Sequence, residues 1–217
     1  MKYKYLFIAL LLWGIHQIPD ILLGHRDLVF TLVGNQIGLY QPLLVTFLWL
    51  SQFMVIGFAV LIAHKSGLFG KIKTTFTLKR IVFLIICAVS LLVINYGIAY
   101  LKNTYFPNLE NKNQGGIFYF YHTVPKAYFL FSLVISGPFF EELVFRACLF
   151  KLINNDTLSF VVSTVIFPLF HVTDIGALVY IPSALLFTYL YAKRKVVTDN
   201  LLVHMLHNLF SSYSLFL

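Results

Sequence analysis

Long apolar runs alternate with short polar turns along most of this chain. A membrane-spanning helix needs about 20 mostly apolar residues, and the runs predict about seven spanning helices. The fifth and sixth runs are short and are joined only by TDIG, so the pattern allows six to eight spans. The predicted spans are 5–23, 43–63, 81–101, 127–150, 158–172, 177–192 and 201–217.

The composition agrees with a membrane protein. Hydrophobic residues make up 59% of the 217 residues and charged residues 11%, whereas soluble domains carry about 25% charged residues. We therefore predict an all-α, polytopic transmembrane helical bundle, with one membrane domain over residues 1–217. The net charge of +8 fits lysines in cytoplasmic loops, so it does not predict a nucleic-acid partner. Cys87 and Cys148 fall inside apolar runs, which does not indicate a disulfide framework.

The distribution of lysine and arginine predicts a cytoplasmic N-terminus. When the spans alternate from that starting point, the basic residues lie mainly on the cytoplasmic side, as the positive-inside rule requires. The first run resembles a signal peptide but lacks a clear small-residue cleavage site, so we expect a retained first span. Eleven basic residues lie inside, namely Lys2, Lys4, Lys65, Lys71, Lys73, Lys79, Arg80, Lys151, Lys193, Arg194 and Lys195, and four lie outside, namely Arg26, Lys102, Lys112 and Lys126.

The polar segment 102–126 is predicted to be the longest loop. Its first half is rich in lysine, asparagine and glutamine, which is typical of a solvated loop, and it contains Glu110. Its second half is aromatic enough to lie at the membrane interface.

A few ionisable or amide side chains fall inside the apolar runs. Such groups are costly in a membrane and usually face the bundle interior or a wet cavity, so each is a candidate functional residue. His16 and Asp20 lie near the end of the first span, where we expect an interfacial position. The remaining set is Glu141, Glu142, Arg146, His171, His204, His207 and Asn208.

The two adjacent glutamates are predicted to have different surroundings. Glu142 and Arg146 are four residues apart, so they share a helix face and can form an ion pair. Glu141 lies about 100° around the helix and points elsewhere. Gly137 and Pro138 can bend the helix just before it. The alternative is that both glutamates and Arg146 form one structural charge cluster.

The imidazoles of two later helices can approach Glu141. Glu141 and His171 are nearly symmetric about the turn NNDT, and both lie roughly 20 Å along the chain from it. Two antiparallel helices leaving this turn would bring them to similar depth. His204 and Asn208 share one face of the last span, where His204 is expected about 10–15 Å from the preceding basic turn, shallower than Glu141.

These residue types fit peptide hydrolysis by an activated water. Burial disfavours a charged carboxylate, which suits a general base that takes a proton from water and later gives it to a leaving amine. Histidine and asparagine can orient the water or hold the oxyanion of a tetrahedral intermediate. A glutamate with two histidines is also a catalytic zinc ligand set, although the H-E-x-x-H signature is missing.

Three motifs, in order, resemble those of the CPBP family, which contains type II CAAX prenyl-proteases and bacterial bacteriocin-processing and self-immunity (Abi) proteins. EELVFR fits EExxxR, FPLFH fits FxxxH and HMLHN fits HxxxN. The resemblance covers residues 127–217, which it marks as the catalytic core, whereas residues 1–126 hold spans and a loop without motifs. The short chain resembles the bacterial branch of the family.

The resemblance implies an intramembrane glutamic protease without a cofactor. Glu141 would be the base that activates water, and His171 would assist in positioning that water. The remaining implied roles are support of the base by Glu142 and Arg146 and an oxyanion site formed by His204 and Asn208. The resemblance implies no role for His207, which we expect, with Phe167, to support the site.

Other functions stay open at this point. A non-proteolytic immunity or regulatory protein of the same fold, a zinc-dependent membrane protease, or a transporter with proton-relaying carboxylates would use the same residues. For the protease, we expect a peptide or membrane-protein substrate in the lipid bilayer, a possible membrane-protein partner, and a multi-pass location in a bacterial plasma membrane.

Overall fold

A computed structural model describes residues 3–32, 34, 36–70, 77–108, 112–172 and 175–215 of the protein. These residues form helices and contain no strand, which confirms the predicted all-α membrane bundle. The N-terminal half contains α1 (Tyr3–His16), α2 (Ile18–Gly24), α3 (Arg26–Leu32), α4 (Ile37–Lys65), α5 (Leu78–Tyr105) and α6 (Lys112–Thr123).

The C-terminal half begins with one long composite helix. Five consecutive segments run without interruption from Lys126 to Ile153, namely α7 (Lys126–Phe131), the π-helical η1 (Ser132–Ser136), α8 (Gly137–Glu142), the π-helical η2 (Leu143–Cys148) and α9 (Leu149–Ile153). After this composite helix, the C-terminal half contains α10 (Asp156–His171), η3 (Ile175–Tyr180), α11 (Ile181–Arg194), α12 (Val197–Ser212) and η4 (Tyr213–Leu215).

Each of the seven predicted spans corresponds to a helical segment. Four of these segments, Tyr3–Gly24, Gly38–Lys65, Leu78–Tyr105 and Lys126–Ile153, are long and apolar enough to cross a bilayer. The helices α10, α11 and α12 have 16, 14 and 16 residues. They are shorter than a spanning helix needs to be, and they pack together beside α5 and α8.

The prediction of a loop over residues 102–126 is wrong in part. Helix α5 continues to Tyr105, and α6 begins at Lys112, so most of the segment is helical. The aromatic half of α6 packs on α7, where the rings of Phe120 and Phe129 have centroids 5.8 Å apart. This tertiary packing overrides the weak helix propensity of Gly115 and Gly116. Glu110, Lys71 and Lys73 lie outside the described residues.

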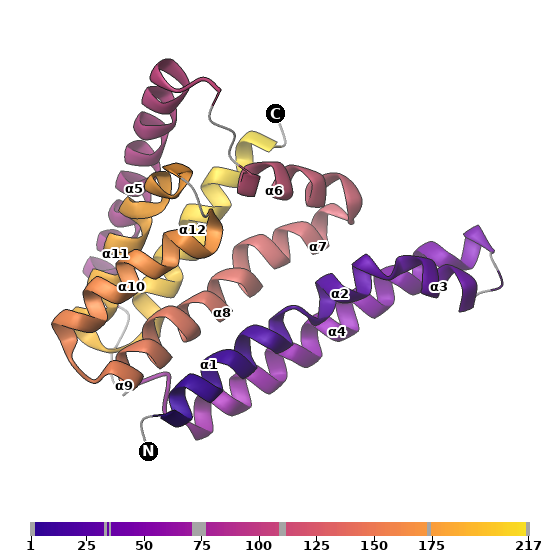
Figure 1. The fold of residues 1–217 in the computed structure, drawn as a ribbon, viewed down its shortest axis with the longest axis horizontal. Coiled ribbons are helices and arrows are strands. Elements are labelled where there is room, and N and C mark those ends of the chain that lie inside the picture. Colours follow the sequence, from indigo (N-terminus) through magenta and orange to yellow (C-terminus); the bar gives the residue numbers. More distant parts are fainter. Residues whose placement is uncertain are drawn as a thin grey trace.

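The composite helix lies between two groups of helices. In Figure 1, α1 and α4 run along one side of it, while α5 and α10–α12 lie on the other. Leu12 of α1 and Ala59 of α4 are fully buried in one apolar cluster with Phe140 and Leu143 of the composite helix. Small residues such as Ala59 allow this close approach of helices. The motif-free N-terminal spans therefore form one wall around the two glutamates.

The polar turn NNDT has the geometry that its residues favour. Asn154 ends α9 in the left-handed conformation with φ of 56°, which asparagine tolerates better than most residues. The side chain of Asn155 accepts a hydrogen bond from the Leu158 N–H at 2.9 Å and caps α10. The turn thus sends α10 back along the composite helix.

Helix termini rich in basic residues meet at one end of the bundle, which we call the basic end. Asp199 of α12 is 2% exposed and accepts hydrogen bonds from Arg80 of α5, while its second oxygen lies 3.0 Å from Arg194 of α11. Lys151 of α9 lies over the ring of Tyr5. An exposed pair, Lys195 with Asp156, joins the same end at 2.6 Å. Asp199 therefore ties three helices together.

We predict that Asp199→Asn lowers the free energy of unfolding by about 3–5 kcal/mol, because it removes the anionic partner of two arginines in a buried setting. Asp156→Asn removes an exposed ion pair at the same end and should cost below about 1 kcal/mol. Denaturant unfolding of the purified variants in one detergent measures both values. Equal destabilisation by the two substitutions would contradict the role of Asp199.

Candidate active site

The composite helix changes its hydrogen-bond register just before the glutamates. In η1, the Gly137 N–H donates to the Ser132 carbonyl, five residues back. The next residue, Pro138, has no N–H to donate, and in the same register its partner would be the Leu133 carbonyl. That carbonyl accepts instead from the side-chain amide of Asn208 at 2.9 Å. Helix α12 thus supplies the hydrogen bond that Pro138 removes, and π-helical segments often mark functional sites.

Glu142 is the structural glutamate of the pair. Its side chain has no exposed surface, and its Oε1 lies 3.1 Å from Arg146, which is also fully buried. His204 approaches the same oxygen through Nδ1 at 2.9 Å, and the amide of Asn200 donates to Oε2. Burying a charge without partners is very costly, so these donors are what allow Glu142 to lie inside the bundle.

Glu141 has different surroundings although it is the adjacent residue. Its side chain is 18% exposed and lines a cavity of about 810 Å³. Its Oε2 is buried and accepts no hydrogen bond. The nearest imidazole nitrogens are Nε2 of His204 at 3.7 Å and Nε2 of His171 at 3.9 Å. These distances are too long for direct hydrogen bonds, and they leave the carboxylate oxygen directed at a shared space.

In both imidazoles a hydrogen bond made by Nδ1 orients the ring, so that Nε2 faces that space. His171 donates through Nδ1 to the Phe167 carbonyl at 2.9 Å, and His204 donates through Nδ1 to the Glu142 carboxylate. A neutral imidazole carries one proton, so both neutral rings present an unprotonated Nε2 to Glu141. A water between them would donate one proton to Glu141 and the other to an imidazole nitrogen.

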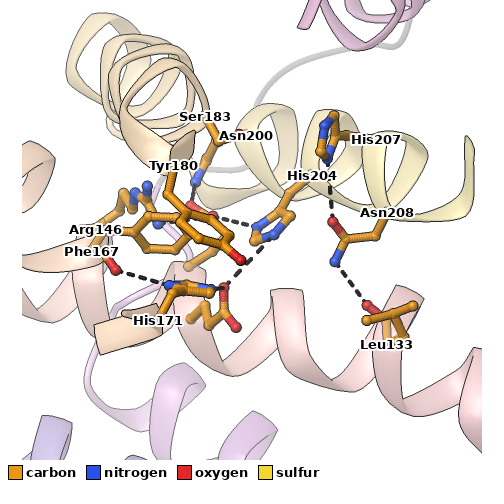
Figure 2. Close-up of polar contacts among 12 residues, drawn as sticks. Leu133, Arg146, Phe167, His171, Tyr180, Ser183, Asn200, His204, His207 and Asn208 are labelled. Atoms are coloured by element: carbon orange, nitrogen blue, oxygen red, sulfur yellow. Dashed lines mark hydrogen bonds and ion pairs between the residues drawn. The ribbon is translucent and has the colours of Figure 1, made fainter. Parts of the chain in front are cut away.

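Aromatic rings hold both imidazoles in place. The ring of Phe187 stacks on His204 with centroids 4.3 Å apart, and Tyr180 stacks on His171 at 4.8 Å. The guanidinium carbon of Arg146 lies 4.2 Å from the centroid of Phe167. Phe167 therefore contacts the buried arginine, and its backbone carbonyl orients His171. Figure 2 shows Phe167 and His171 of α10, Tyr180 of η3 and His204 of α12 converging.

His207 and Asn208 lie in a second polar chain, separate from the contacts around Glu141. Asn95 of α5 donates to Nε2 of His207 at 2.9 Å, so His207 carries its proton on Nδ1. That nitrogen faces Oδ1 of Asn208 at 3.4 Å, and Asn208 in turn donates to Leu133 (Figure 2). One amide hydrogen of Asn208 is therefore occupied, and the predicted oxyanion role would use the other.

The structure adds residues to the site that the sequence did not single out. Asn200, His204 and Asn208 follow one another at intervals of four, so they lie on one face of α12. This spacing of four in the sequence is the signal that could have identified Asn200 as a site residue. His16, expected at the interface, lines the cavity with Glu141, and its ring stacks on Phe140 at 4.6 Å. The interfacial position stays a prediction, and the structure places His16 at the cavity wall where α1 packs on α8.

A metal site was the alternative interpretation of the same side chains. Among the described residues, no group of three or more His, Cys, Asp or Glu side chains is arranged to hold a metal ion.

Comparisons with known proteins identify the family. UPF0177 protein YbdJ of Lactococcus lactis subsp. lactis (strain IL1403) is 30% identical over 161 residues, which cover 71% of this chain and 70% of the relative. The chain belongs to the UPF0177 family. UPF0177 protein YaiH of the same strain is 27% identical over 95% of this chain and 87% of its own length. A further member, described as the UPF0177 protein in abiGi 5'region of Lactococcus lactis subsp. cremoris, is 27% identical over 95% of this chain and 88% of its own.

A second comparison links this UPF0177 chain to proteases. The model of the family described as type II CAAX prenyl endopeptidase Rce1-like matches residues 123–210. This match supports the resemblance to the CPBP family that the three motifs carry, and it makes residues 123–210 similar to CAAX-type membrane proteases. No solved structure matches the chain.

We predict that substituting Gln for each of the two adjacent glutamates changes the free energy of unfolding by very different amounts. Glu142→Gln leaves Arg146 buried without its anionic partner and should lower the free energy of unfolding by about 3–5 kcal/mol. Glu141→Gln should change it by less than about 1 kcal/mol, because Oε2 of Glu141 accepts no hydrogen bond. Thermal unfolding of both purified variants tests this, and a similar loss in both would show that the glutamates form one structural cluster.

Proposed function

We propose that the protein is an intramembrane endopeptidase in which Glu141 activates a water molecule without a metal. One observation carries the proposal. The only buried carboxylate oxygen of the described residues that accepts no hydrogen bond belongs to Glu141, and it faces Nε2 of both His204 and His171 across 3.7 and 3.9 Å. A general base must reach the proton that it abstracts, and a water in this space lies within reach of all three groups.

The proposed reaction begins with proton transfer from water to Glu141. The water oxygen forms a bond to the carbonyl carbon of the scissile peptide unit, and the carbonyl oxygen becomes an oxyanion. Glu141 then passes the proton to the amide nitrogen, and the C–N bond breaks as the oxyanion re-forms the carbonyl. One fragment leaves as an amine, and the new carboxylic acid on the other gives its remaining proton to that amine. His171, held by the Phe167 carbonyl, orients the water throughout.

The oxyanion needs hydrogen-bond donors on the opposite side of the scissile carbonyl. In this proposal His204 donates through Nε2 while its Nδ1 is held by the buried carboxylate of Glu142. The second amide hydrogen of Asn208 is the other donor in this proposal.

The substrate in this proposal is a peptide or a membrane-protein segment. The location would be multi-pass in the plasma membrane of a bacterium, with the N-terminus cytoplasmic. The Rce1-like match supports proteolysis as the kind of activity, and the Lactococcus relatives support the bacterial setting.

We predict that Glu141→Gln lowers peptide cleavage by about 10²–10⁴-fold, the range that a general base contributes. His171→Ala and His204→Ala should each cause a large loss as well. The assay uses purified protein in lipid nanodiscs, an unbiased peptide mixture, and mass spectrometry to find the products. Cleavage by Glu141→Gln at the wild-type rate would sink the proposal.

Chelation provides the control for mechanism. Treatment with 1,10-phenanthroline should leave cleavage unchanged, because no step of the proposed reaction uses a metal. Loss of activity that Zn²⁺ restores would replace the glutamate mechanism with zinc catalysis. Glu142→Gln is not a suitable control here, since its predicted instability alone would lower activity.

A further inference from the structure

The cavity that contains Glu141 extends toward one end of the bundle. Its lining includes Lys102 and Asn103 near the end of α5, Asn113 near the start of α6, and Tyr180 just before α11. All of these lie at the end opposite the basic end. Among the described residues, no lining residue comes from the helix termini that Asp199, Lys151 and Lys195 join. The cavity therefore leads from Glu141 away from the basic end.

The membrane orientation determines which compartment this cavity faces. Lysine and arginine concentrate on the cytoplasmic side of membrane proteins, and the basic end carries most of them. The end with Lys102 and Asn113 is then extracytoplasmic. A molecule that reaches Glu141 along the cavity comes from outside the cell.

Several amide side chains lie among the apolar and aromatic residues that line the cavity beyond the active site. Asn95 is half-buried, and its Oδ1 is buried without a hydrogen-bond partner. Asn113 donates to the Tyr180 hydroxyl at 2.8 Å, so α6 is fastened across this part of the cavity to the residue that stacks on His171. Each peptide unit has one donor and one acceptor, and a backbone N–H can donate to the unpaired Oδ1 of Asn95.

Lys102 adds a charge to the same wall. It is the one lysine or arginine among the described residues that line the cavity, and no carboxylate of the described residues pairs with it. It lies seven residues beyond Asn95 on α5, about 10 Å along the helix. An extended peptide covers that distance in about three residues, so one peptide can contact both side chains.

We propose that the cavity binds an extended peptide segment that enters from the extracytoplasmic side with a carboxylate at Lys102. The peptide backbone uses Oδ1 of Asn95 as an acceptor, and the carboxylate belongs either to an acidic side chain or to a chain terminus. This proposal rests on the proteolytic function proposed above for its catalytic outcome, but the direction of entry is measurable without catalysis.

Thiol labelling tests the direction of entry. Single cysteines are introduced as Asn103→Cys in the cavity and Lys193→Cys at the basic end, with the wild-type protein and its two native cysteines as the blank. A membrane-impermeant maleimide added to intact cells should label Asn103→Cys and should label Lys193→Cys only after lysis. The reverse pattern would overturn the proposed direction, whether or not the protein is a protease.

A control cysteine next to Asn103 tests whether the peptide occupies the cavity. Thr104 is exposed and does not line the cavity, so Thr104→Cys reports the same end of the bundle without the site. Saturating peptide should slow labelling of Asn103→Cys by about threefold or more and leave Thr104→Cys unchanged. Equal rates at Asn103→Cys with and without peptide would contradict binding in the cavity. The Glu141→Gln background prevents turnover during the experiment.

A charge reversal tests the role of Lys102. Quenched decapeptides carry one Glu or one Lys, each with a free or an amidated C-terminus. The wild type should cleave a peptide with a carboxylate about threefold to tenfold better in kcat/KM, and Lys102→Glu should invert the preference. If the preference for the peptide with a carboxylate persists when the C-terminus is amidated, the carboxylate at Lys102 is that of the Glu side chain. If amidation abolishes the preference, the carboxylate is that of the C-terminus.

The control for charge is Lys126→Glu, at the same end but outside the cavity lining, where Lys126 donates to the Tyr121 carbonyl at 2.6 Å. It should keep the wild-type preference. An unchanged preference in Lys102→Glu would remove Lys102 from the proposal. Cleavage retained by Glu141→Gln would instead remove the proposed protease mechanism and leave the labelling result standing.

Discussion

The buried carboxylate of Glu142 is the interaction on which the site depends. It has no exposed surface, and its donors come from two helices, with Arg146 on its own composite helix and Asn200 and His204 on α12. Because a buried charge must keep its donors, the position of α12 against α8 is fixed by this carboxylate. Nε2 of His204 is then directed at Glu141 as a consequence. One glutamate thus provides the geometry that leaves its neighbour available for chemistry.

A second contact holds the same two helices one turn of α12 farther along. Asn200, His204 and Asn208 recur at intervals of four and face the composite helix, where Asn208 compensates for the N–H that Pro138 lacks. The break at Pro138 and the π-helical segment before it are therefore stabilised from outside their own helix. Gly137 fits this place because a Cβ there would lie 3.2 Å from the Ser132 carbonyl oxygen. One stripe of three polar side chains on α12 thus supports both the irregular backbone before Pro138 and the buried carboxylate of Glu142.

Much of this arrangement follows from residue spacing. The spacing of four predicts that Glu142 pairs with Arg146, and the symmetry of Glu141 and His171 about NNDT predicts that they approach each other; the structure brings both pairs together. The expected shallow position of His204 is not observed, because α12 begins inside the bundle, with Val197 and Asp199 already buried. The hydrogen-bond direction of His207 and the positions of Asn95 and His16 depend on helices distant in sequence. Periodicity within one helix carries no information about those contacts.

The position of His16 changes what counts as the unit of this protein. The part of the chain that resembles CAAX-type proteases starts at residue 123, yet an imidazole from the first helix lines the same chamber as Glu141. Leu12 and Ala59 close the adjacent wall. The matched portion, residues 123–210, therefore does not enclose the chamber by itself. In engineering terms, moving this site onto another membrane scaffold requires the helices before residue 123 as well as those after it.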